Sequence, residues 1–400
     1  MKHLVFYIAA FAVILSLFIS FSKLHARLLN NFKLLFCSCL ALCVYACDVG
    51  VHYRADEAMD MASVEPVSIS EPSISKICQI FGSRQLISAG DYIITITKNI
   101  DSLFYIIDPN TKEVLTSIGN KGRGPNDFLL PFSSKQYWKD DSGNTILVFI
   151  DSQGIYTINL SESVYNGYPV KEKIGNLASF GEYVATINQE AILGENESMR
   201  WIGPKYRDAR DGLEQPPCFI HHTPDYDFDF NIFPRLFRNP SFREIHYFAH
   251  EGPFRIRPDK RKVAYSPSIL DELVIFDLGK NSSKRVIGDS PFSFEDLSKK
   301  SYDNIINTGQ LFSIDASVTN GLIAVLYDGR KIIDTQKENI GSSSYTKIFD
   351  WEGNTLAELH FDKYYTQISL NENNQELYLL DTEDNICRLD LQPYITTSSD

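Results

Sequence analysis

From about Ile74 to Tyr394, the chain alternates between short apolar runs and clusters of turn-forming residues. Runs such as DYIITITK, NTILVFID and ELYLLD are rich in β-branched and aromatic residues, which is typical of β-strands. No long stretch keeps the 3.6-residue hydrophobic period of an amphipathic helix. The pattern therefore predicts an all-β domain over residues 74–400.

One phrase recurs within this domain: an apolar run, an aspartate, a turn and a second apolar run. It reads FYIIDPNTKEVL, VFIDSQGIYTINL, VIFDLGKNSSKRV, KIFDWEGNTLAEL and LYLLDTEDNICRL, with its aspartate at Asp108, Asp151, Asp277, Asp350 and Asp381. We interpret the phrase as a β-hairpin whose aspartate accepts hydrogen bonds from backbone N–H groups of the turn. These aspartates are therefore predicted to be structural rather than catalytic.

Repeated hairpins in a domain of this length are typical of a β-propeller, in which four-stranded antiparallel sheets, the blades, stand around an axis. Roughly 320 residues, divided by blades of about 40 to 50 residues, give six or seven blades. The repeats are unevenly spaced, and we predict a six-bladed β-propeller.

The stretch IGNKGRGPNDFLLP, from Ile118 to Pro131, could be a phosphate-binding loop or a turn. Phosphate loops need a helix directly after their glycines, because its N-terminal N–H groups hold the phosphate. Here prolines and a strand follow instead, which favours a connection between two blades. In it, the glycines supply positive φ, Phe128 fills the gap between neighbouring sheets and Pro131 begins the next inner strand. The motif consists of Gly119, Gly122, Gly124, Pro125, Phe128 and Pro131.

This stretch and the following DDSGNTILVFIDSQGIYTINL resemble one NHL-type propeller repeat. In that repeat, G-x-x-G-x-G-P-x-x-F-x-x-P leads to a Gly-Asn turn, a strand, an aspartate and a last strand. The whole layout is similar to that of the six-bladed, TolB-like propeller lipoproteins of Bacteroidetes. The resemblance rests on the repeat from Ile118 to Leu160, on several degenerate repeats and on the start of the chain. It implies a six-bladed propeller attached to the bacterial cell envelope.

Two apolar runs open the chain, Leu4 to Phe21 and Leu34 to Cys47, with a basic stretch between them. The second run has the layout of a secretory signal. Its end, Val44-Tyr45-Ala46-Cys47, resembles a bacterial lipoprotein signal, although Tyr45 departs from the small residue usual at its place. The resemblance implies that Cys47 is lipidated and begins the mature protein. The first run is either a transmembrane helix or the product of an upstream start codon, and we favour the second.

We accordingly divide the chain into a membrane or signal region, residues 1–47, a flexible tether, 48–73, and the propeller, 74–400. The tether assignment rests on a polar composition that is low in aromatic residues. The formal net charge is −13, and residues 1–47 contain four cations and no acid, so the remaining chain is strongly acidic. Such a body repels nucleic acid, and we expect no nucleic-acid partner.

Three cysteines lie beyond the signal region: Cys78, Cys218 and Cys387. Their odd number and the lack of C-x-x-C exclude a zinc ribbon and a disulfide-dense scaffold. Cys78 lies near the start of the propeller and Cys387 near its end, so closure of a ring would bring them close. They form either a single disulfide or, as we expect, buried free thiols.

The region from Pro204 to His250 is long, only weakly repetitive and dense in Tyr, Phe, His and Arg. These residue types are enriched in contact surfaces. His246 and His250, four apart and near several aspartates, could bind zinc from one helix face. The glutamate of the metalloprotease motif is missing, however, and we favour an insertion loop. The predicted binding surface consists of His221, His222, Tyr226, Phe228, Phe230, His246, Tyr247 and His250.

No nucleophile motif such as G-x-S-x-G occurs in the sequence. Our leading hypothesis is a lipid-anchored propeller, periplasmic or at the cell surface, that binds or scaffolds an envelope protein, peptide or glycan. It predicts no cofactor and no catalytic activity. The alternative is a metal-dependent hydrolase, similar to lactonase-like six-bladed enzymes, with a divalent cation in the central channel. Several carboxylate, Asn or His side chains on the axis would favour the enzyme, whereas a plugged channel would count against it.

Overall fold

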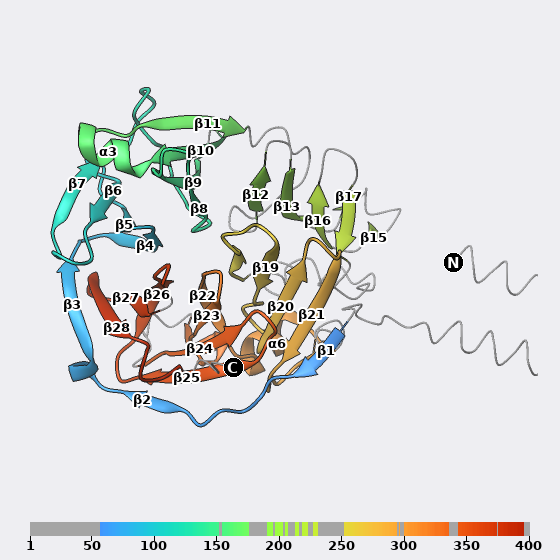
Figure 1. Ribbon diagram of the computed structural model, residues 1–400. Helices are drawn as coiled ribbons and strands as arrows, with labels where there is room; N and C mark the ends of the chain where they lie inside the picture. The colour runs from blue at the N-terminus through green and yellow to red at the C-terminus, as the bar shows by residue number, and fades with distance from the viewer. Residues whose placement is uncertain are drawn as a thin grey trace, which may run out of the picture. The chain divides into compact units, whose positions relative to one another are not determined.

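The structure is a computed structural model that describes residues 57–151, 154–175, 252–293, 296, 300–335, 343–373 and 375–395. Between residues 190 and 230 it describes backbone strands alone. Within these parts the chain is almost entirely β-structure, as the hydrophobic pattern predicted (Figure 1).

Five sheets, each with four antiparallel strands at its centre and here called blades A to E, are described with their side chains. Blades A and B come first in the chain. Blade A consists of β4 (Ser83–Ala89), β5 (Tyr92–Thr97), β6 (Phe104–Ile107) and β7 (Val114–Ile118). Blade B consists of β8 (Tyr137–Lys139), β9 (Thr145–Asp151), β10 (Gly154–Asn159) and β11 (Lys171–Gly175).

Blades C to E are formed by the last third of the chain. Blade C contains β18 (Phe254–Ile256), β19 (Lys262–Tyr265), β20 (Glu272–Asp277) and β21 (Ser282–Ile287). Blade D contains β22 (Ser313–Val318), β23 (Leu322–Tyr327), β24 (Tyr345–Asp350) and β25 (Thr355–Phe361). Blade E contains β26 (Tyr365–Leu370), β27 (Glu376–Asp381), β28 (Asn385–Asp390) and, from the other end of the domain, β3 (Ile74–Gln79).

A further antiparallel sheet, described by its backbone, lies between blades B and C in the sequence. Its strands are β12 (Glu190–Gly194), β13 (Glu197–Ile202), β16 (Cys218–His222) and β17 (Asp227–Phe230). A two-stranded ribbon, β14 (Lys205–Tyr206) and β15 (Leu213–Gln215), is inserted between β13 and β16. Strand β12 contacts β18, the first strand of blade C. The region expected as an insertion loop thus contains paired strands, and in one of them, DFDF, polar and apolar residues alternate.

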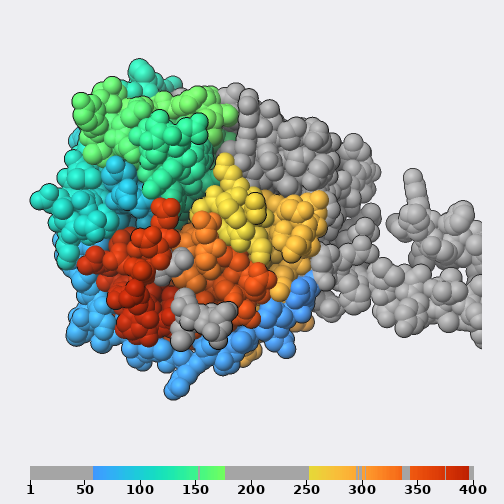
Figure 2. Space-filling view, in the orientation of Figure 1, coloured from blue at the N-terminus to red at the C-terminus, as the bar shows by residue number. Residues whose placement is uncertain are grey.

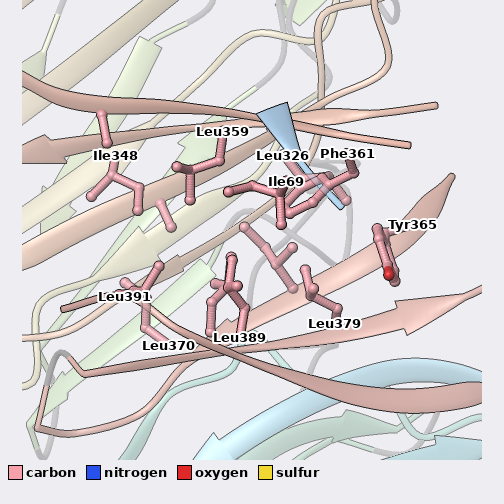
Figure 3. Close-up of a cluster of buried hydrophobic side chains, with 14 of the residues drawn as sticks. Ile69, Leu326, Ile348, Leu359, Phe361, Tyr365, Leu370, Leu379, Leu389 and Leu391 are labelled. Atoms are coloured by element: carbon pink, nitrogen blue, oxygen red, sulfur yellow. The ribbon is translucent and has the colours of Figure 1, made fainter. Parts of the chain in front are cut away.

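The blades pack face to face around an axis, and their apolar side chains form layers between them. One layer joins blades A and B, another C and D, another D and E, and another E and A. In the layer between D and E, Ile348 and Leu359 face Leu370 and Leu389 (Figure 3). Strand β23 is buried at every position because sheets cover both of its faces. Two-sided burial explains why such strands read as continuous apolar runs rather than alternating ones.

The ring closes through β3, which pairs with β28 so that Ile74 lies opposite Leu389. Atoms from the start and the end of the domain therefore lie against one another, blue beside red in the space-filling view (Figure 2). Cys78 and Cys387 are on these paired strands, and both are free. Cys78 faces the layer between blades E and A, whereas Cys387 is buried between D and E. Side chains on opposite faces of a sheet point apart and cannot form a disulfide. The expected pair of free thiols is therefore confirmed.

The tether predicted for residues 48–73 is wrong where the structure describes it. Strand β1 (Glu57–Asp60) pairs in parallel with the outer edge of β21, and β2 (Val67–Ile69) pairs in parallel with that of β25 (Figure 1). Blades C and D therefore have five strands, not four. Ile69 is only 2% exposed, because it packs into the layer between D and E. We call residues 57–73 the strap.

Among the described residues, four short helical segments lie between strands: η1 (Glu71–Ser73), α3 (Leu160–Asn166), α6 (Tyr302–Thr308) and α7 (Ile332–Thr335). Helix α3 begins at Asn159, whose side chain accepts a hydrogen bond from the Glu162 N–H, and ends at Gly167 with φ of 72°. This is a standard N-cap and left-handed C-cap. No helix among the described residues has both the length and the apolar character needed to cross a membrane.

The recurring aspartates bind turns as predicted. Asp108, Asp277, Asp350 and Asp381 each accept a backbone N–H from the turn that follows, at 2.7 to 3.0 Å. Asp151 differs, because its two carboxylate oxygens accept the N–H groups of Leu129 and Leu130 from the preceding connection. All five are accounted for by structural hydrogen bonds.

Candidate functional site

The first strand of each blade lies nearest the axis, and these strands carry buried polar side chains. Strands β4 and β26, β26 and β22, and β22 and β18 are in contact with one another. Their buried polar residues, together with those of the segment that leads into β8, include Gln85, Ser88, Ser133, Lys135, Arg255, Asp315, Ser317 and Ser369. The axis is therefore polar, although it is closed off from water. Buried polar groups of this kind need hydrogen-bond partners.

Lys135 is positioned by a bend in the segment before β8. Its φ is 62°, in the left-handed region that non-glycine residues rarely adopt. The Ser133 hydroxyl accepts the Lys135 N–H at 2.9 Å and donates to the Val148 carbonyl at 2.8 Å. The side-chain amide of Gln85, in blade A, accepts the Ser133 N–H at 2.8 Å and donates to the Ser133 carbonyl at 3.1 Å. These bonds hold the bend in place.

From this bend the Lys135 side chain extends to the opposite side of the ring. Its ammonium donates to Asp315 Oδ2 of blade D at 2.5 Å and to the Ile368 carbonyl of blade E at 2.6 Å. Lys135 comes from blade B, so a single side chain joins three blades. Its side chain is only 3% exposed and that of Asp315 2%.

Arg255 of blade C completes the group. It donates to Asp315 Oδ1 at 2.9 Å and to the carbonyls of Ala316 and Phe254 at 2.7 and 2.9 Å. Asp315 Oδ2 also accepts the N–H of Ile368 at 2.8 Å. Blades B, C, D and E thus meet at one carboxylate. We call Lys135, Arg255 and Asp315 the axial triad.

The axial triad carries two cations and one anion, so its formal charge is +1. Burial lowers the pKa of Lys135 to about 8, and the nearby Arg255 adds to this, while Asp315 acts in the opposite direction. Burial also lowers the pKa of the Arg255 guanidinium, against the opposing effect of Asp315. A centre with excess positive charge repels a divalent cation. Among the residues described with side chains, no three His, Cys, Asp or Glu residues gather as metal ligands would.

A second polar group lies on β23, β24 and β25, at one end of blade D. The Tyr327 ring stacks on Tyr345 with centroids 4.9 Å apart, and Tyr345 stacks on His360 at 5.0 Å. Lys347 bonds Asp271 at 2.8 Å and lies 4.9 Å from the Tyr327 ring centre. Burial raises the pKa of Tyr345, and the Asp271 charge adds to this effect. The bond between Lys347 and Asp271 braces blade D against blade C.

Next to this group, Asp328 forms a compact network with Arg330 and Tyr364. Arg330 donates to both Asp328 oxygens at 2.6 Å, and the Tyr364 hydroxyl donates to Asp328 Oδ2 at 2.6 Å. The bidentate ion pair raises the pKa of Arg330 still further above its usual range. This geometry locks the connection between β25 and β26 against the loop after β23.

The predicted binding surface falls partly on described backbone. His221 and His222 are on β16, and Phe228 and Phe230 are on β17, with His221 opposite Phe228 in the register. The two strands are adjacent in one sheet, so these residues lie within a short distance along it. Four members of the predicted surface lie outside the described residues: Tyr226, His246, Tyr247 and His250. Cys47, the predicted lipidation site, also lies outside them.

The glycine motif connects blade A to blade B. Gly119 has φ of 80°, whereas Gly122 and Gly124 are absent from the residues with positive φ, contrary to expectation. A Cβ at either of these two would meet the Asp127 carboxylate at 2.3 or 2.7 Å, so close approach requires them. Phe128 is 1% exposed.

Pro131 does not begin the next inner strand, contrary to expectation, because β8 starts at Tyr137. Phe128 packs against Phe104 of blade A and Phe149 of blade B, with ring centroids 4.9 and 5.2 Å apart. Pro125 is exposed, and Pro131 is buried directly before Phe132, which bridges to Ile150 of β9.

Sequence reasoning missed the axial triad. Its members are separated along the chain by 180 and 60 residues, and no motif joins them. The available signal was an isolated charge in the first strand of a blade, such as Arg255 in FRIRP. Exposed strands carry isolated charges too, so such a charge alone does not indicate a buried ion pair. The arrangement of the first strands around the axis is needed to show that these three charges meet.

The blades around a polar axis define the class of this protein: it is a β-propeller with four-stranded blades, two of them extended by the strap. Residues 245–373 match the family model described as TolB-like 6-blade propeller-like. This match confirms the resemblance to TolB-like propellers, and FRIRPDKRKVAYSP lies within it. No curated protein matches the chain.

Solved structures with similar folds include two from Bacteroides. A putative exported protein of Bacteroides fragilis is 12% identical, with a TM-score of 0.48, covering 83% of this chain and 97% of that one. A member of the duf4221 family from Bacteroides vulgatus is 10% identical, with a TM-score of 0.49, covering 79% of this chain and 95% of that one.

Proposed function

We propose that this protein is a lipid-anchored, six-bladed propeller of the bacterial cell envelope, periplasmic or at the cell surface. It binds or scaffolds an envelope protein, peptide or glycan and catalyses no reaction. The sheet of β12, β13, β16 and β17 supplies the remaining blade, since it lies between blades B and C in the sequence and β12 contacts β18.

The observation that carries the non-catalytic part is the axial triad. In a metal-dependent propeller enzyme, metal-coordinating side chains from several inner strands would have to converge on the axis. Here the axis is crossed by Lys135, whose ammonium, like the Asp315 carboxylate, is committed to hydrogen bonds within the propeller. Excess positive charge at this point disfavours the alternative, a hydrolase with a divalent cation in the channel.

Binding is then assigned to the outer surface of the ring, at the sheet of β16 and β17. Strand β16 ends in two histidines and β17 carries two phenylalanines, and aromatic side chains form contact surfaces in propellers and other binding proteins. The partner class follows from location: an envelope protein, peptide or glycan. The acidic body supports the absence of a nucleic-acid partner.

Lipid attachment is tested by metabolic labelling with radioactive palmitate in the wild type and in Cys47→Ala. Label in the wild type alone supports the anchor. Label in neither protein, or in both equally, removes Cys47 as the attachment site. This outcome leaves the binding part standing, because the two parts rest on separate observations.

Binding is tested by photo-crosslinking in intact cells, with a photoreactive amino acid at His222 and a matched control at Tyr165. Tyr165 is 90% exposed on α3, in a different blade. A product formed from position 222 alone supports the assigned surface. Equal products from both positions contradict the assigned surface. The non-catalytic part is tested separately, by assaying the protein for hydrolysis of lactones. Hydrolysis that requires an added divalent cation overturns it.

A further inference from the structure

Three connections beside blade A expose large apolar side chains on the same end of the propeller. They are residues 80–82, between blades E and A, residues 98–103, between β5 and β6, and residues 119–131, between blades A and B. Phe81 is 73% exposed, Ile100 61% and Leu130 54%. We call these three connections the blade A rim. Exposed apolar residues that gather in this way mark interaction surfaces more often than scattered ones do.

Backbone hydrogen bonds join the rim into one surface. The Lys98 N–H donates to the Gly82 carbonyl at 2.8 Å, and the Lys121 N–H donates to the Ile100 carbonyl at 2.7 Å. The first bond links the first two connections, and the second links the last two. The three connections are therefore held next to one another, which lowers the ordering cost of binding.

The outermost part of the rim is fixed as well. The N–H of Leu130 donates to Asp151 Oδ1 at 2.7 Å. Behind Leu130, the buried Phe128 ring anchors this connection between blades A and B. Leu130 is thus presented to the outside by a buried neighbour rather than by a free loop.

Three exposed cations accompany the apolar side chains: Lys98, Lys121 and Arg123. None of the three has an ion-pair partner within the described part of the chain. Of the two acids on the rim, Asp101 is exposed, whereas the Asp127 carboxylate accepts the Gly124 N–H at 2.8 Å. Within the three connections the formal charge is +1, in a protein whose net charge is −13. The Asp384 carboxylate of the neighbouring turn accepts the Gly82 N–H at 2.8 Å, so acids also border the rim.

We propose that the blade A rim docks on an anionic lipid surface. The apolar side chains stand singly at the tips of connections rather than lining a groove, which suits shallow insertion at the boundary between headgroups and acyl chains. Cations beside them lie at the depth of the lipid phosphates, where each basic residue strengthens binding about fivefold. The acidic body does not cancel this attraction, because charges more than about 8 Å away are screened at physiological salt.

This inference goes beyond the proposed binding role and does not rest on lipidation of Cys47. It fixes which end of the propeller faces the membrane. The end formed by residues 80–82, 98–103 and 119–131 lies against the lipid, whether or not an anchor also holds the chain.

The test uses a tryptophan reporter in the full-length protein, reconstituted in vesicles whose acyl chains carry bromine, a contact quencher. Phe81→Trp places the reporter on the rim, and Tyr165→Trp is the matched control at an exposed site away from it. The unsubstituted protein gives the background from its own tryptophans. Vesicles contain either phosphatidylglycerol with phosphatidylcholine or phosphatidylcholine alone.

We expect quenching at position 81, no added quenching at position 165, and a loss of the effect in pure phosphatidylcholine. Replacing Lys98, Lys121 and Arg123 by Gln in the Phe81→Trp protein should weaken vesicle binding by about a hundredfold. Equal quenching at both positions overturns the proposal. So does an absence of quenching at position 81, or quenching that is unaffected by removal of the anionic lipid or of the three cations.

Discussion

The axial triad predicts opposite consequences for the loss of its anion and the loss of one of its cations. Asp315→Asn keeps the size of the side chain but leaves Lys135 and Arg255 buried without a counter-charge. Both cations are at most 6% exposed in their side chains. Breaking a buried ion pair in this way costs about 3 to 5 kcal/mol of the free energy of unfolding.

Lys135→Met removes the extra positive charge instead and leaves a neutral pair of Asp315 and Arg255. It deletes the hydrogen bond to the Ile368 carbonyl, which costs about 1 to 3 kcal/mol if the carbonyl stays dry. Relief from burying a cation offsets this cost, because burial lowers the pKa of Lys135 to about 8. We expect a net change within about 1 kcal/mol.

Urea denaturation followed by intrinsic fluorescence measures both changes, provided that the slope of the transition stays constant. Arg255→Met serves as a second control, because it too leaves one cation paired with Asp315. If Lys135→Met destabilises the protein as much as Asp315→Asn does, the triad does not carry an excess positive charge that weakens the fold. The predicted difference between the two variants is then refuted.

The same triad predicts a pH dependence with a definite sign. Below pH 8, Lys135 is protonated in both the folded and the unfolded chain, and the folded state bears the full penalty of burying the charge. Between pH 8 and the usual lysine pKa of about 10.5, the unfolded chain binds more protons, so the free energy of unfolding rises with pH. Relative to Lys135→Met, the wild type should gain up to about 1.4 kcal/mol per pH unit in this window. A flat difference between the two proteins from pH 7.5 to 9 would contradict the assignment.

Three further predictions concern packing and reactivity. Phe128→Ala should lower the free energy of unfolding by about 3 to 5 kcal/mol, whereas Phe81→Ala, at a position 73% exposed, should change it by less than about 0.5 kcal/mol in urea denaturation. Ile69→Ala should release the strap and speed proteolysis there, and Val67→Ala, at a position 37% exposed on the same strand, should not; equal cleavage would refute a packed strap. Cys387, whose pKa burial raises to about 11, should react with iodoacetamide at pH 8 about a hundredfold more slowly than in the unfolded chain, as measured by peptide mass spectrometry.

The propeller could be predicted because its signal is local and repeated. Each hairpin carries an apolar run, an aspartate and a turn, and the hydrogen bonds of Asp108 and Asp350 lie within a few residues of the aspartate. Phe128 could be placed between two sheets because it follows glycines and precedes Pro131. Such features depend on neighbours along the chain.

The strap and the axial triad could not be predicted in the same way. The strap strands are four and three residues long and mostly exposed, and their partners lie more than two hundred residues away. Their sequence is therefore that of a polar linker, and the anchoring Ile69 is a single apolar residue within it. Lys135 is inward-facing only because its backbone adopts a left-handed bend, and a lysine gives no local sign of such a bend.

Ring closure through β3 and β28 also sets an order for biosynthesis. The strap and β3 are made first, but the edges they pair with in blades C, D and E are made last. The emerging chain therefore keeps its first segments unpaired until nearly all of the propeller has been synthesised. The ring of a protein built in this way stays open until its final hairpin arrives.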